Sequence, residues 1–553
     1  MKKYLFLTCL LLVSQIHAQG DFELEKSVDG TSSKIYTEDR KLLDDLSAIE
    51  KQEMELKDID VDTFVNFEKE IFALDNISYD FNNKYDFLNE NLGQKDSFAR
   101  AKQGSNNFYF GLSSYDKLDG LEYGLEYLNK YEGLEYKANI ERKVRGEERK
   151  NTDKGMDKFH LDLAYDNIKG QFKVDRLDEN YGGMKNSTSQ VEASRKLLEL
   201  EGIFEYTVLD TAQENYKVNA EIYYADSDSV SLSTSPYTRE WTNTAINLYG
   251  TYAKMLNTEA SSHLLEGKIG YLYDGMYKGK SGTLYLEGKD RFRISALNDI
   301  DFRSHFAIES SSKETSSDEF NFSAGLSARK QIDNHLTLFG SLAKDNRNKQ
   351  ARDIRNNFEY TSDILAFNDL KTEDNYIINA GASYLLDNIF VETSASLIRS
   401  KDKLFYQQVE SDTGKEYSIT PSSYNKTLTW TELALRATYT FDENLRTEAV
   451  IDYNSQDKLS YIPNIKSALS AVYNFDKYEA RANFRYNGDM YANINKQNKL
   501  DSYTAFDLIT TYNFNSNMSG VFAIENIFDT NKEVLTNYPV DSRKFTLKIN
   551  MKF

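Results

Sequence analysis

The sequence predicts an all-β protein, a transmembrane antiparallel β-barrel of about 22 strands with a short N-terminal periplasmic or lumenal segment. Apolar and polar residues alternate over most of residues 106–553, as expected for strands with one apolar and one polar face. Aromatic residues are frequent, with 39 Tyr and 32 Phe. Short and long connections also alternate along the chain, which is typical of outer-membrane barrels. A soluble propeller would instead need a repeat of about 40 to 50 residues and no such alternation.

Residues 1–18 are predicted to be a secretory signal peptide. Lys2 and Lys3 precede an apolar run over residues 4–13, and a short polar stretch ends at Ala18. The chain has a single cysteine, Cys9, which lies inside this run, so the mature chain has no disulfide and no thiolate metal site. No later stretch is long and apolar enough for a spanning helix. The net charge of -20 argues against nucleic acid as a partner.

Residues 19–105 are predicted to form a separate acidic segment, because acidic residues are dense there and apolar alternation is poor. Thr37 is a candidate helix cap, since Leu42, Leu43, Leu46 and Ile49 follow it at helical spacing. We expect a partly helical segment that is either a reduced plug of the barrel or a periplasmic extension. A helix that docks on a dedicated partner is the alternative.

Residues 106–553 are predicted to be the barrel, built as a succession of hairpins. The dipeptides Asp166-Asn167, Asp333-Asn334 and Asp387-Asn388 mark tight turns, since these residues tolerate the backbone angles that such turns need. Tight turns are expected near residues 166, 333, 387, 443, 476 and 515. Long loops are expected at residues 144–156, 226–240, 345–373, 400–426, 489–501 and 527–541. The stretches 178–210 and 281–300 are weak strands by this pattern.

Aromatic residues mark the two ends of the predicted strands. Tyr439 and Phe441, Tyr473 and Phe475, and Tyr512 and Phe514 each stand immediately before a tight turn, and they indicate one interfacial girdle. The two tryptophans, Trp241 and Trp430, follow long loops and are expected to supply the other girdle. All four prolines, Pro236, Pro421, Pro463 and Pro539, fall in predicted loops, where no ladder hydrogen bond is lost.

No arrangement of residues predicts an enzyme, a cofactor or a metal site. The mature chain has four histidines, His160, His263, His305 and His335, which are scattered over different hairpins, and His160 is expected to face the lumen as a solvated polar residue. Phosphate-binding loops and metal-ligand motifs are absent from the sequence. The predicted lumenal face carries mixed charges at Arg436, Arg446, Glu448, Glu479, Arg481, Arg485, Lys548 and Lys552, as any wide water-filled or plugged barrel requires.

The C-terminal residues carry a family resemblance. The element Glu525-Asn526-Ile527-Phe528-Asp529 is followed by Asn537-Tyr538-Pro539, then by Arg543 and a strand that alternates to a terminal Phe553. This order resembles the C-terminus of TonB-dependent receptors, closely over about 30 residues and loosely over the whole barrel through the expected strand number. The resemblance implies outer-membrane lipid, the barrel assembly machinery, TonB and an extracellular ligand as partners. It also implies that Phe553 is the assembly signal.

Two functions remain open at this stage. The resemblance implies uptake of a scarce nutrient across the outer membrane, with termini in the periplasm and long loops outside. The family's Gly-rich plug with its I-R-G element has no counterpart in residues 19–105, and no convincing TonB box is present. The alternative is therefore a plug-less pore, or a surface or envelope scaffold protein, without energised transport. The ligand, the oligomeric state and the ligand-binding residues are not indicated.

Overall fold

The computed structural model describes residues 106–553 apart from short gaps at 115–117, 132, 146–153, 182–192, 212–213, 232–236, 259, 277–278, 295–299, 314–317, 334, 347–370, 387, 411–416, 425, 443, 457–461, 493–498, 531, 536–537 and 540–541. The chain divides into two units, Met1–Glu70 and Ile71–Phe553, and all described residues belong to the second. The predicted signal peptide and the predicted helix near residues 37–57 lie outside the described residues.

Every regular element of the described residues is a β-strand, and none of these residues forms a helix long and apolar enough to cross a membrane. The barrel strands are β1 (Asn107–Ser114), β2 (Leu118–Tyr131), β3 (Leu134–Arg145), β4 (Lys154–Tyr165), β5 (Ile168–Tyr181), β6 (Ala193–Asp210), β7 (Glu214–Ser231), β8 (Tyr237–Asn257), β9 (Ser261–Met276), β10 (Gly279–Ile294), β11 (Ile300–Lys313), β12 (Glu319–Gln331), β13 (Leu336–Asp345), β14 (Asp374–Leu386), β15 (Ile389–Lys401), β18 (Leu428–Thr440), β19 (Leu445–Asn454), β20 (Ile465–Phe475), β21 (Tyr478–Asn487), β24 (Tyr503–Asn515), β25 (Met518–Glu525) and β28 (Lys544–Lys552). Three short hairpins, β16 (Lys403–Glu410) with β17 (Tyr417–Tyr424), β22 (Met490–Tyr491) with β23 (Lys499–Leu500), and β26 (Glu533–Leu535) with β27 (Tyr538–Pro539), lie in the connections.

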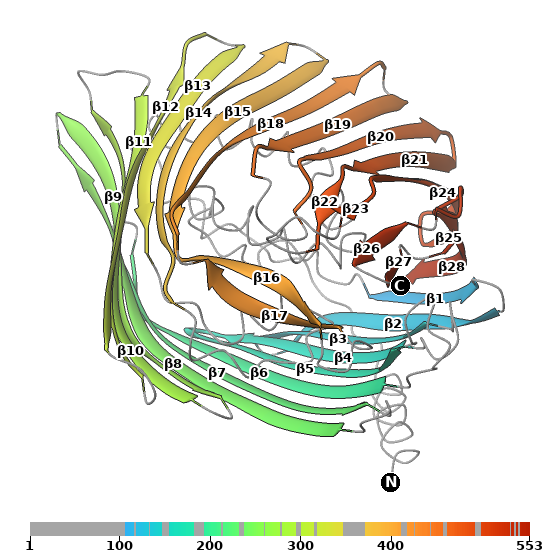
Figure 1. Ribbon diagram of the computed structural model, residues 1–553, viewed down its shortest axis with the longest axis horizontal. Coiled ribbons are helices and arrows are strands. Elements are labelled where there is room, and N and C mark those ends of the chain that lie inside the picture. The colour runs from blue at the N-terminus through green and yellow to red at the C-terminus, as the bar shows by residue number, and fades with distance from the viewer. Residues whose placement is uncertain are drawn as a thin grey trace. The chain divides into compact units, whose positions relative to one another are not determined.

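The large sheet has 22 strands and closes on itself, which confirms the predicted fold class and strand number. The first strand, β1, pairs with β2 on one side and with the last strand, β28, on the other (Figure 1). Beyond the last ladder pair, Asn106 and Phe553 exchange two backbone hydrogen bonds of 3.0 and 2.9 Å. Closure removes every sheet edge of the barrel, so the backbone groups of its strands are paired within the protein.

The two ends of the barrel differ in most of their connections, as predicted, with two exceptions: only two residues join β9 to β10 at the end with the long loops, and five join β10 to β11 at the other end. Tight connections join β2 to β3, β4 to β5, β14 to β15, β18 to β19, β20 to β21 and β24 to β25, at the end where Asn106 and Phe553 also lie. We call this the turn end. The opposite end holds the three extra hairpins and the connection between β13 and β14. All four prolines lie outside the 22 barrel strands, as predicted, although Pro421 and Pro539 belong to the short strands β17 and β27.

The prediction of a loop at residues 226–240 is wrong over most of that range. Strand β7 continues to Ser231 and β8 begins at Tyr237, so only the five residues 232–236 connect them. On β7 the outward positions change from Val218 and Ile222 to Asp226 and Asp228. The outward residues therefore stop being apolar before the strand ends. The weak stretches 178–210 and 281–300 are likewise mostly strand, in β5, β6 and β10.

Aspartate residues shape the tight turns in two ways. Asp166 and Asp476 adopt positive φ angles of 52° and 50°, where short polar side chains are tolerated better than most. At the β12–β13 turn, Asp333 Oδ1 accepts hydrogen bonds from the amides of His335 and Leu336, both of 2.8 Å. Asp442 accepts the equivalent two bonds at the β18–β19 turn. Both turns are longer than the two-residue hairpin expected at Asp333, because β12 ends at Gln331 and β13 begins at Leu336, while β18 ends at Thr440 and β19 begins at Leu445. The aspartate side chains accept backbone amides within these longer turns.

The aromatic girdle predicted at the turn end is present. Phe441, Tyr473, Phe475 and Phe514 are between 46% and 60% exposed on the outer surface. Neighbouring rings contact each other: Tyr439 meets Phe441 edge to face at 4.3 Å, and Tyr512 meets Phe514 in the same way at 5.0 Å. Amphipathic rings gathered at one level of an outer wall are typical of a membrane–water interface.

The outer wall between the two ends is apolar and exposed. Leu248, Tyr271 and Leu284 lie side by side on β8, β9 and β10, with 53%, 48% and 57% of their surfaces exposed. Comparable side chains occupy the outward positions of the other barrel strands. Such an extended apolar surface is unfavourable in water and matches the hydrocarbon core of a bilayer.

Candidate functional site: the lumenal wall

The inward positions of the barrel are assigned by the alternation along each strand. On β19, for example, Ile451 is 43% exposed on the outside whereas Glu448, on the inward face, is 7% exposed. All eight charged residues predicted to face the lumen lie on inward positions, namely Arg436, Arg446, Glu448, Glu479, Arg481, Arg485, Lys548 and Lys552. Several of them pair with each other or with nearby carboxylates, as Arg446 does with Glu448 at 2.6 Å.

Charges on the closing seam of the barrel are paired across strands. Lys548 Nζ of β28 lies 3.3 Å from Glu122 Oε1 of β2 and 3.9 Å above the ring of Tyr109 of β1. On the adjacent strands, Lys137 Nζ lies 2.9 Å from Glu126 Oε2. The seam therefore carries ion pairs and a cation–π contact on the lumenal side in addition to its backbone ladder.

His160 faces the lumen as predicted. Its Nε2 lies 3.0 Å from Asp175 Oδ1 on the neighbouring strand β5. The other three histidines lie on other elements: His263 on the outer face of β9 with Asp290, His305 on the inward face of β11, and His335 at the β12–β13 turn against the Leu385 carbonyl. The four imidazoles are thus scattered over different hairpins. Among the described residues there is no group of three or more His, Cys, Asp or Glu placed to hold a metal ion.

A tyrosine and carboxylate group lies on the inward face of β7 to β10. The Tyr249 hydroxyl donates to Glu221 Oε1 at 2.7 Å, and Asn247 Nδ2 donates to Glu221 Oε2 at 3.0 Å. The Tyr285 hydroxyl donates to Asn247 Oδ1 at 2.8 Å. Lys268 Nζ lies 4.0 Å from the centre of the Tyr249 ring. The Glu221 carboxylate on the inner wall thus accepts hydrogen bonds from uncharged side chains, and aromatic rings lie beside it.

The loop after β25 is shaped by the sequence element that resembles TonB-dependent receptors. Asn526 and Asp529 have positive φ angles of 48° and 51°. The Asn526 side chain closes the turn, since its Oδ1 accepts the Thr530 amide at 3.0 Å and its Nδ2 donates to the Thr530 carbonyl at 3.2 Å. Arg543 ends the same connection, and its amide donates to Asp529 Oδ1 at 2.9 Å. Asn526, Asp529 and Arg543 of the element that resembles the receptors therefore have a structural role in this turn.

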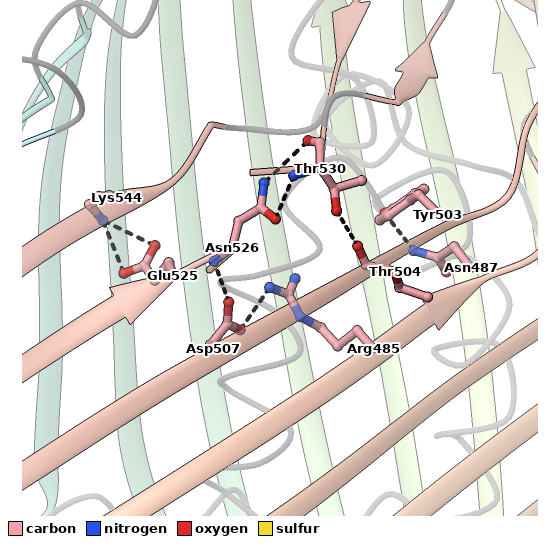
Figure 2. A network of polar contacts seen from close by, with 9 residues as sticks. All are labelled: Arg485, Asn487, Tyr503, Thr504, Asp507, Glu525, Asn526, Thr530 and Lys544. Carbon is pink, nitrogen blue, oxygen red and sulfur yellow. Dashed lines mark hydrogen bonds and ion pairs between the residues drawn. The ribbon is translucent and has the colours of Figure 1, made fainter. Parts of the chain in front are cut away.

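The turn is attached to the barrel wall through Asp507, which is 0% exposed (Figure 2). Asp507 Oδ1 accepts the amide of Asn526 at 2.7 Å, and its Oδ2 lies 2.7 Å from Arg485 Nη2. The Thr530 hydroxyl donates to the Thr504 carbonyl at 2.7 Å. A buried ion pair thus joins β21 to β24, and two hydrogen bonds attach the connection after β25 to β24. Arg485 lies on the lumenal face as the sequence predicts, whereas the only sign of Asp507 in the sequence is an acidic residue between Phe506 and Leu508.

The expectation that Trp430 belongs to an interfacial girdle is wrong. Trp430 lies on an inward position of β18, is 4% exposed, and packs in a cluster with Ala343, Ile377, Ile398 and Leu428. Its Nε1 donates to Glu432 Oε1 at 2.5 Å, so the buried indole has a partner. Residues an odd number of positions apart on a strand point to opposite faces. Leu433 is three residues from Trp430 and faces outward, so Trp430 faces inward. The Trp241 side chain lies outside the described residues.

The barrel is similar in fold to solved structures of receptors and a transporter. The ferric-catecholate import receptor Fiu from K12 E. coli aligns with a TM-score of 0.63 at 10% sequence identity, covering 82% of each chain. The copper transporter OprC aligns with a TM-score of 0.62 at 13% identity, covering 82% of this chain and 81% of its own. The siderophore receptor PirA from Acinetobacter baumannii aligns with a TM-score of 0.62 at 12% identity, again over 82% and 81%.

No family model matches the chain, and no curated protein sequence matches it. The similarity to solved structures therefore concerns the fold. It confirms a barrel that resembles those of TonB-dependent receptors, as the C-terminal residues predicted.

Proposed function

We propose that this chain is an outer-membrane import receptor that takes up a scarce nutrient. The observation that carries the proposal is a closed barrel of 22 strands with an apolar outer wall and a charged, ion-paired inner wall. Solved proteins with this fold include a ferric-catecholate import receptor, a copper transporter and a siderophore receptor. A barrel of this size encloses a lumen wider than its own side chains can fill, which suits passage of a bulky ligand.

The proposed topology follows from the two unlike ends. Residues 1–18 act as the export signal, residues 19–105 lie on the periplasmic side or in the lumen, and residues 106–553 form the barrel. The turn end, with both barrel termini, faces the periplasm, and the opposite end faces the exterior. Short turns on the periplasmic side and longer loops outside are the rule for such barrels.

Protease treatment of intact cells tests this topology. We expect cleavage within residues 345–373 or 400–426, which follow β13 and β15 at the end opposite the barrel termini. Residues 21–105 should be cut only after the outer membrane is opened. Cleavage of residues 21–105 in intact cells, with both loops intact, would contradict the proposed orientation.

Uptake is tested by comparing cells with and without the chain. We expect the deletion strain to accumulate less of at least one probe among a ferric catecholate complex, a ferric siderophore and copper, and re-expression to restore uptake. Dependence of that uptake on TonB would extend the resemblance to energy coupling. Equal accumulation of all probes in both strains would contradict the import proposal for these ligands.

The second candidate is a plug-less pore or a surface and envelope scaffold. It is favoured by one observation, the absence of the I-R-G element and of a convincing TonB box from residues 19–105. A pore would admit probes without TonB. A scaffold would leave uptake of every probe unchanged and would instead yield an envelope protein when cross-linked through residues 19–105.

A further inference from the structure

Three outward side chains of β9 and β10 form a chain of hydrogen bonds at the turn end of the barrel. His263 Nδ1 lies 2.9 Å from Asp290 Oδ2, and His263 Nε2 lies 3.0 Å from Ser261 Oγ. Ser261 and His263 share one face of β9 because they are two residues apart, and Asp290 is the diagonal neighbour of His263 on β10. We call these three residues the outer triad.

The carboxylate of Asp290 determines the direction of these hydrogen bonds. An ionised carboxylate only accepts, so His263 Nδ1 carries a proton and donates it to Asp290. The Nε2 atom of the neutral imidazole then accepts the Ser261 hydroxyl. Asp290 Oδ1 is shielded from solvent and has no hydrogen-bond partner among the described residues. Burial of an unsatisfied carboxylate oxygen is costly, so stability alone does not account for Asp290 at this position.

The turn before β9 supplies a further hydroxyl group. Thr258 Oγ1 accepts the amides of Ala260 at 3.3 Å and of Ser261 at 3.0 Å. Its own proton is then available to donate to the Ser261 carbonyl at 3.1 Å or to Ser261 Oγ at 3.2 Å. Ser261 Oγ can therefore accept from Thr258 while it donates its proton to His263. The same threonine hydroxyl lies within reach of an oxyanion on a group bonded to Ser261 Oγ.

The outer triad lies at the border of the apolar outer wall. The Phe292 ring stacks on the His263 ring at 5.5 Å between centroids, and on the Phe302 ring at 5.1 Å. Leu256 of β8 is the register partner of His263 on the other side and is 37% exposed. His263 and Asp290 are 31% and 21% exposed, so a molecule in the membrane surface can reach them. An acyl chain packed on these apolar side chains would bring its ester group beside Ser261.

We propose that the outer triad is an esterase site, which cleaves the carboxylic ester of an acyl lipid at the membrane surface. Ser261 is the nucleophile, His263 is the general base and then the general acid, and Asp290 positions the imidazole in the required tautomer. This activity goes beyond the import function proposed above and does not depend on it, because the outer triad lies on the outer wall and not in the lumen.

The acyl transfer requires only the ester and water. Ser261 Oγ bonds to the carbonyl carbon while His263 Nε2 takes its proton, and the carbonyl electron pair moves onto the oxygen, to which Thr258 donates. The bond from the acyl carbon to the alcohol oxygen then breaks, and the alcohol leaves with the proton from Nε2. Water next gives a proton to Nε2 and adds to the acyl carbon, and the fatty acid leaves as Ser261 Oγ recovers that proton.

Covalent labelling of purified full-length protein in detergent tests the nucleophile, with a long-chain alkyl fluorophosphonate as the probe. We expect the label on Ser261 by peptide mass spectrometry and none at this position in Ser261→Ala. His263→Gln should slow labelling by about a hundredfold or more, because the general base is lost. Asp290→Asn should also slow labelling strongly, since its amide donates to Nδ1 and leaves the imidazole proton on Nε2.

Hydrolysis gives the second readout. The wild type should release fatty acid from vesicles of phosphatidylethanolamine that contain the protein, and nitrophenol from p-nitrophenyl laurate. Ser261→Ala should release neither above the background of empty vesicles. Cleavage of p-nitrophenyl laurate without release of fatty acid from the vesicles would overturn the assignment of a membrane lipid as the substrate.

His160→Gln is the matched control, because His160 also lies 3.0 Å from an aspartate, Asp175, but faces the lumen. It should leave labelling and hydrolysis unchanged. Heat-dependent gel migration checks that each variant still forms a barrel. The proposal is overturned if the wild type is labelled no faster than Ser261→Ala, or if His263→Gln and Asp290→Asn are both labelled at the wild-type rate. An equal loss in His160→Gln would overturn it as well.

Discussion

Asp507 connects the C-terminal connection to the barrel wall, and its removal should be costly. We expect Asp507→Asn to lower the free energy of unfolding by about 3 kcal/mol, because Arg485 is then left as a half-satisfied buried charge. Arg485 and Asp507 are 13% and 0% exposed, so water cannot replace the lost partner readily. Urea unfolding of the refolded barrel measures the change.

The exposed pair of Lys532 and Asp501 provides the control for that measurement. These side chains are 49% and 68% exposed and lie 2.9 Å apart in the same outer region. Asp501→Asn should cost less than about 1 kcal/mol, as exposed ion pairs generally do. Equal costs for Asp501→Asn and Asp507→Asn would show that burial of the Asp507 pair contributes nothing.

Asp489 gives one outer connection a predictable pH dependence. The hydrogen bond from Lys499, with an Nζ to Oδ2 distance of 2.6 Å, holds the pKa of Asp489 below its ordinary value, and the Ser502 amide donating to Oδ1 lowers it further. A depressed folded pKa means that the contact is fully formed above the ordinary value of about 3.9 and is lost as the pH falls through the lower folded pKa.

Hydrogen exchange at Ser502, corrected for the intrinsic pH dependence, measures this effect. Protection should stay constant from pH 7 to about pH 4 and fall only at lower pH. Asp489→Asn should reduce protection above about pH 4, where the wild-type contact is formed, and should remove the acid transition. A transition above pH 5 in the wild type, or one that persists in Asp489→Asn, would contradict the assignment.

At the scale of single elements, β28 is predicted to carry the assembly signal. Phe553 is 60% exposed and shares two backbone hydrogen bonds with Asn106. Deleting Phe553 should lower the outer-membrane level and leave precursor in the periplasm, as the family resemblance implies. Phe553→Ala keeps both backbone bonds, so it should reproduce the defect only if the aromatic ring itself is recognised.

Leu547→Ala is the control for that test, since Leu547 faces outward on the same strand and is 58% exposed. It removes similar apolar surface without touching the C-terminus. Outer-membrane levels by quantitative blotting decide the outcome. If Phe553→Ala and the deletion both assemble normally, Phe553 is an ordinary lipid-facing residue.

The elements that the sequence predicted well are those governed by local chemistry. The Asp166-Asn167 turn and the Tyr512 and Phe514 girdle depend on neighbouring residues, which a linear pattern contains. The extension of β7 to Ser231 was missed because its outward positions become polar once the apolar band ends. Trp430 is near a loop in the sequence, but its even position on β18 turns the side chain inward, so proximity to a loop is a poor guide to the girdle.

Contacts between residues that are far apart in the sequence cannot be predicted from the alternation of apolar and polar residues. The partners of Asp507 come from β21 and from the connection after β25, and nothing in a linear sequence pairs them. The contact between His263 and Asp290 likewise depends on the register of β9 and β10. A shift of that register by one residue would place Asp290 on the inner wall.

At the scale of the whole molecule, pattern determines this fold more than residue identity does. The barrel aligns with Fiu at a TM-score of 0.63 although 10% of the residues are identical. Alternation, short turns at one end and closure by β1 and β28 are sufficient to specify it, since each outward position needs an apolar residue and rarely a particular one. Under the proposed import function, the residues that select the ligand therefore lie at inward positions or in the outer connections.

The N-terminal segment has a composition that limits how far it can close the lumen. A barrel of 22 strands has a lumen that its own side chains leave partly open, and an open passage of that width would breach the permeability barrier. In TonB-dependent receptors a globular plug fills this space. Residues 21–105 have three glycines, Gly30, Gly93 and Gly104, and no proline, which are too few turn formers for a compact sheet of that size.

We therefore expect residues 21–105 to close the lumen only in part, with the long connections narrowing it further without sealing it. Purified full-length protein in planar bilayers should show a steady residual conductance, and deletion of residues 21–105 should raise it. Conductance that is large and does not change on deletion would mean that the segment fills nothing. A tight seal that the deletion abolishes would show that a short segment suffices as a plug, because the charged inner wall then supplies enough contacts to hold it without a globular fold.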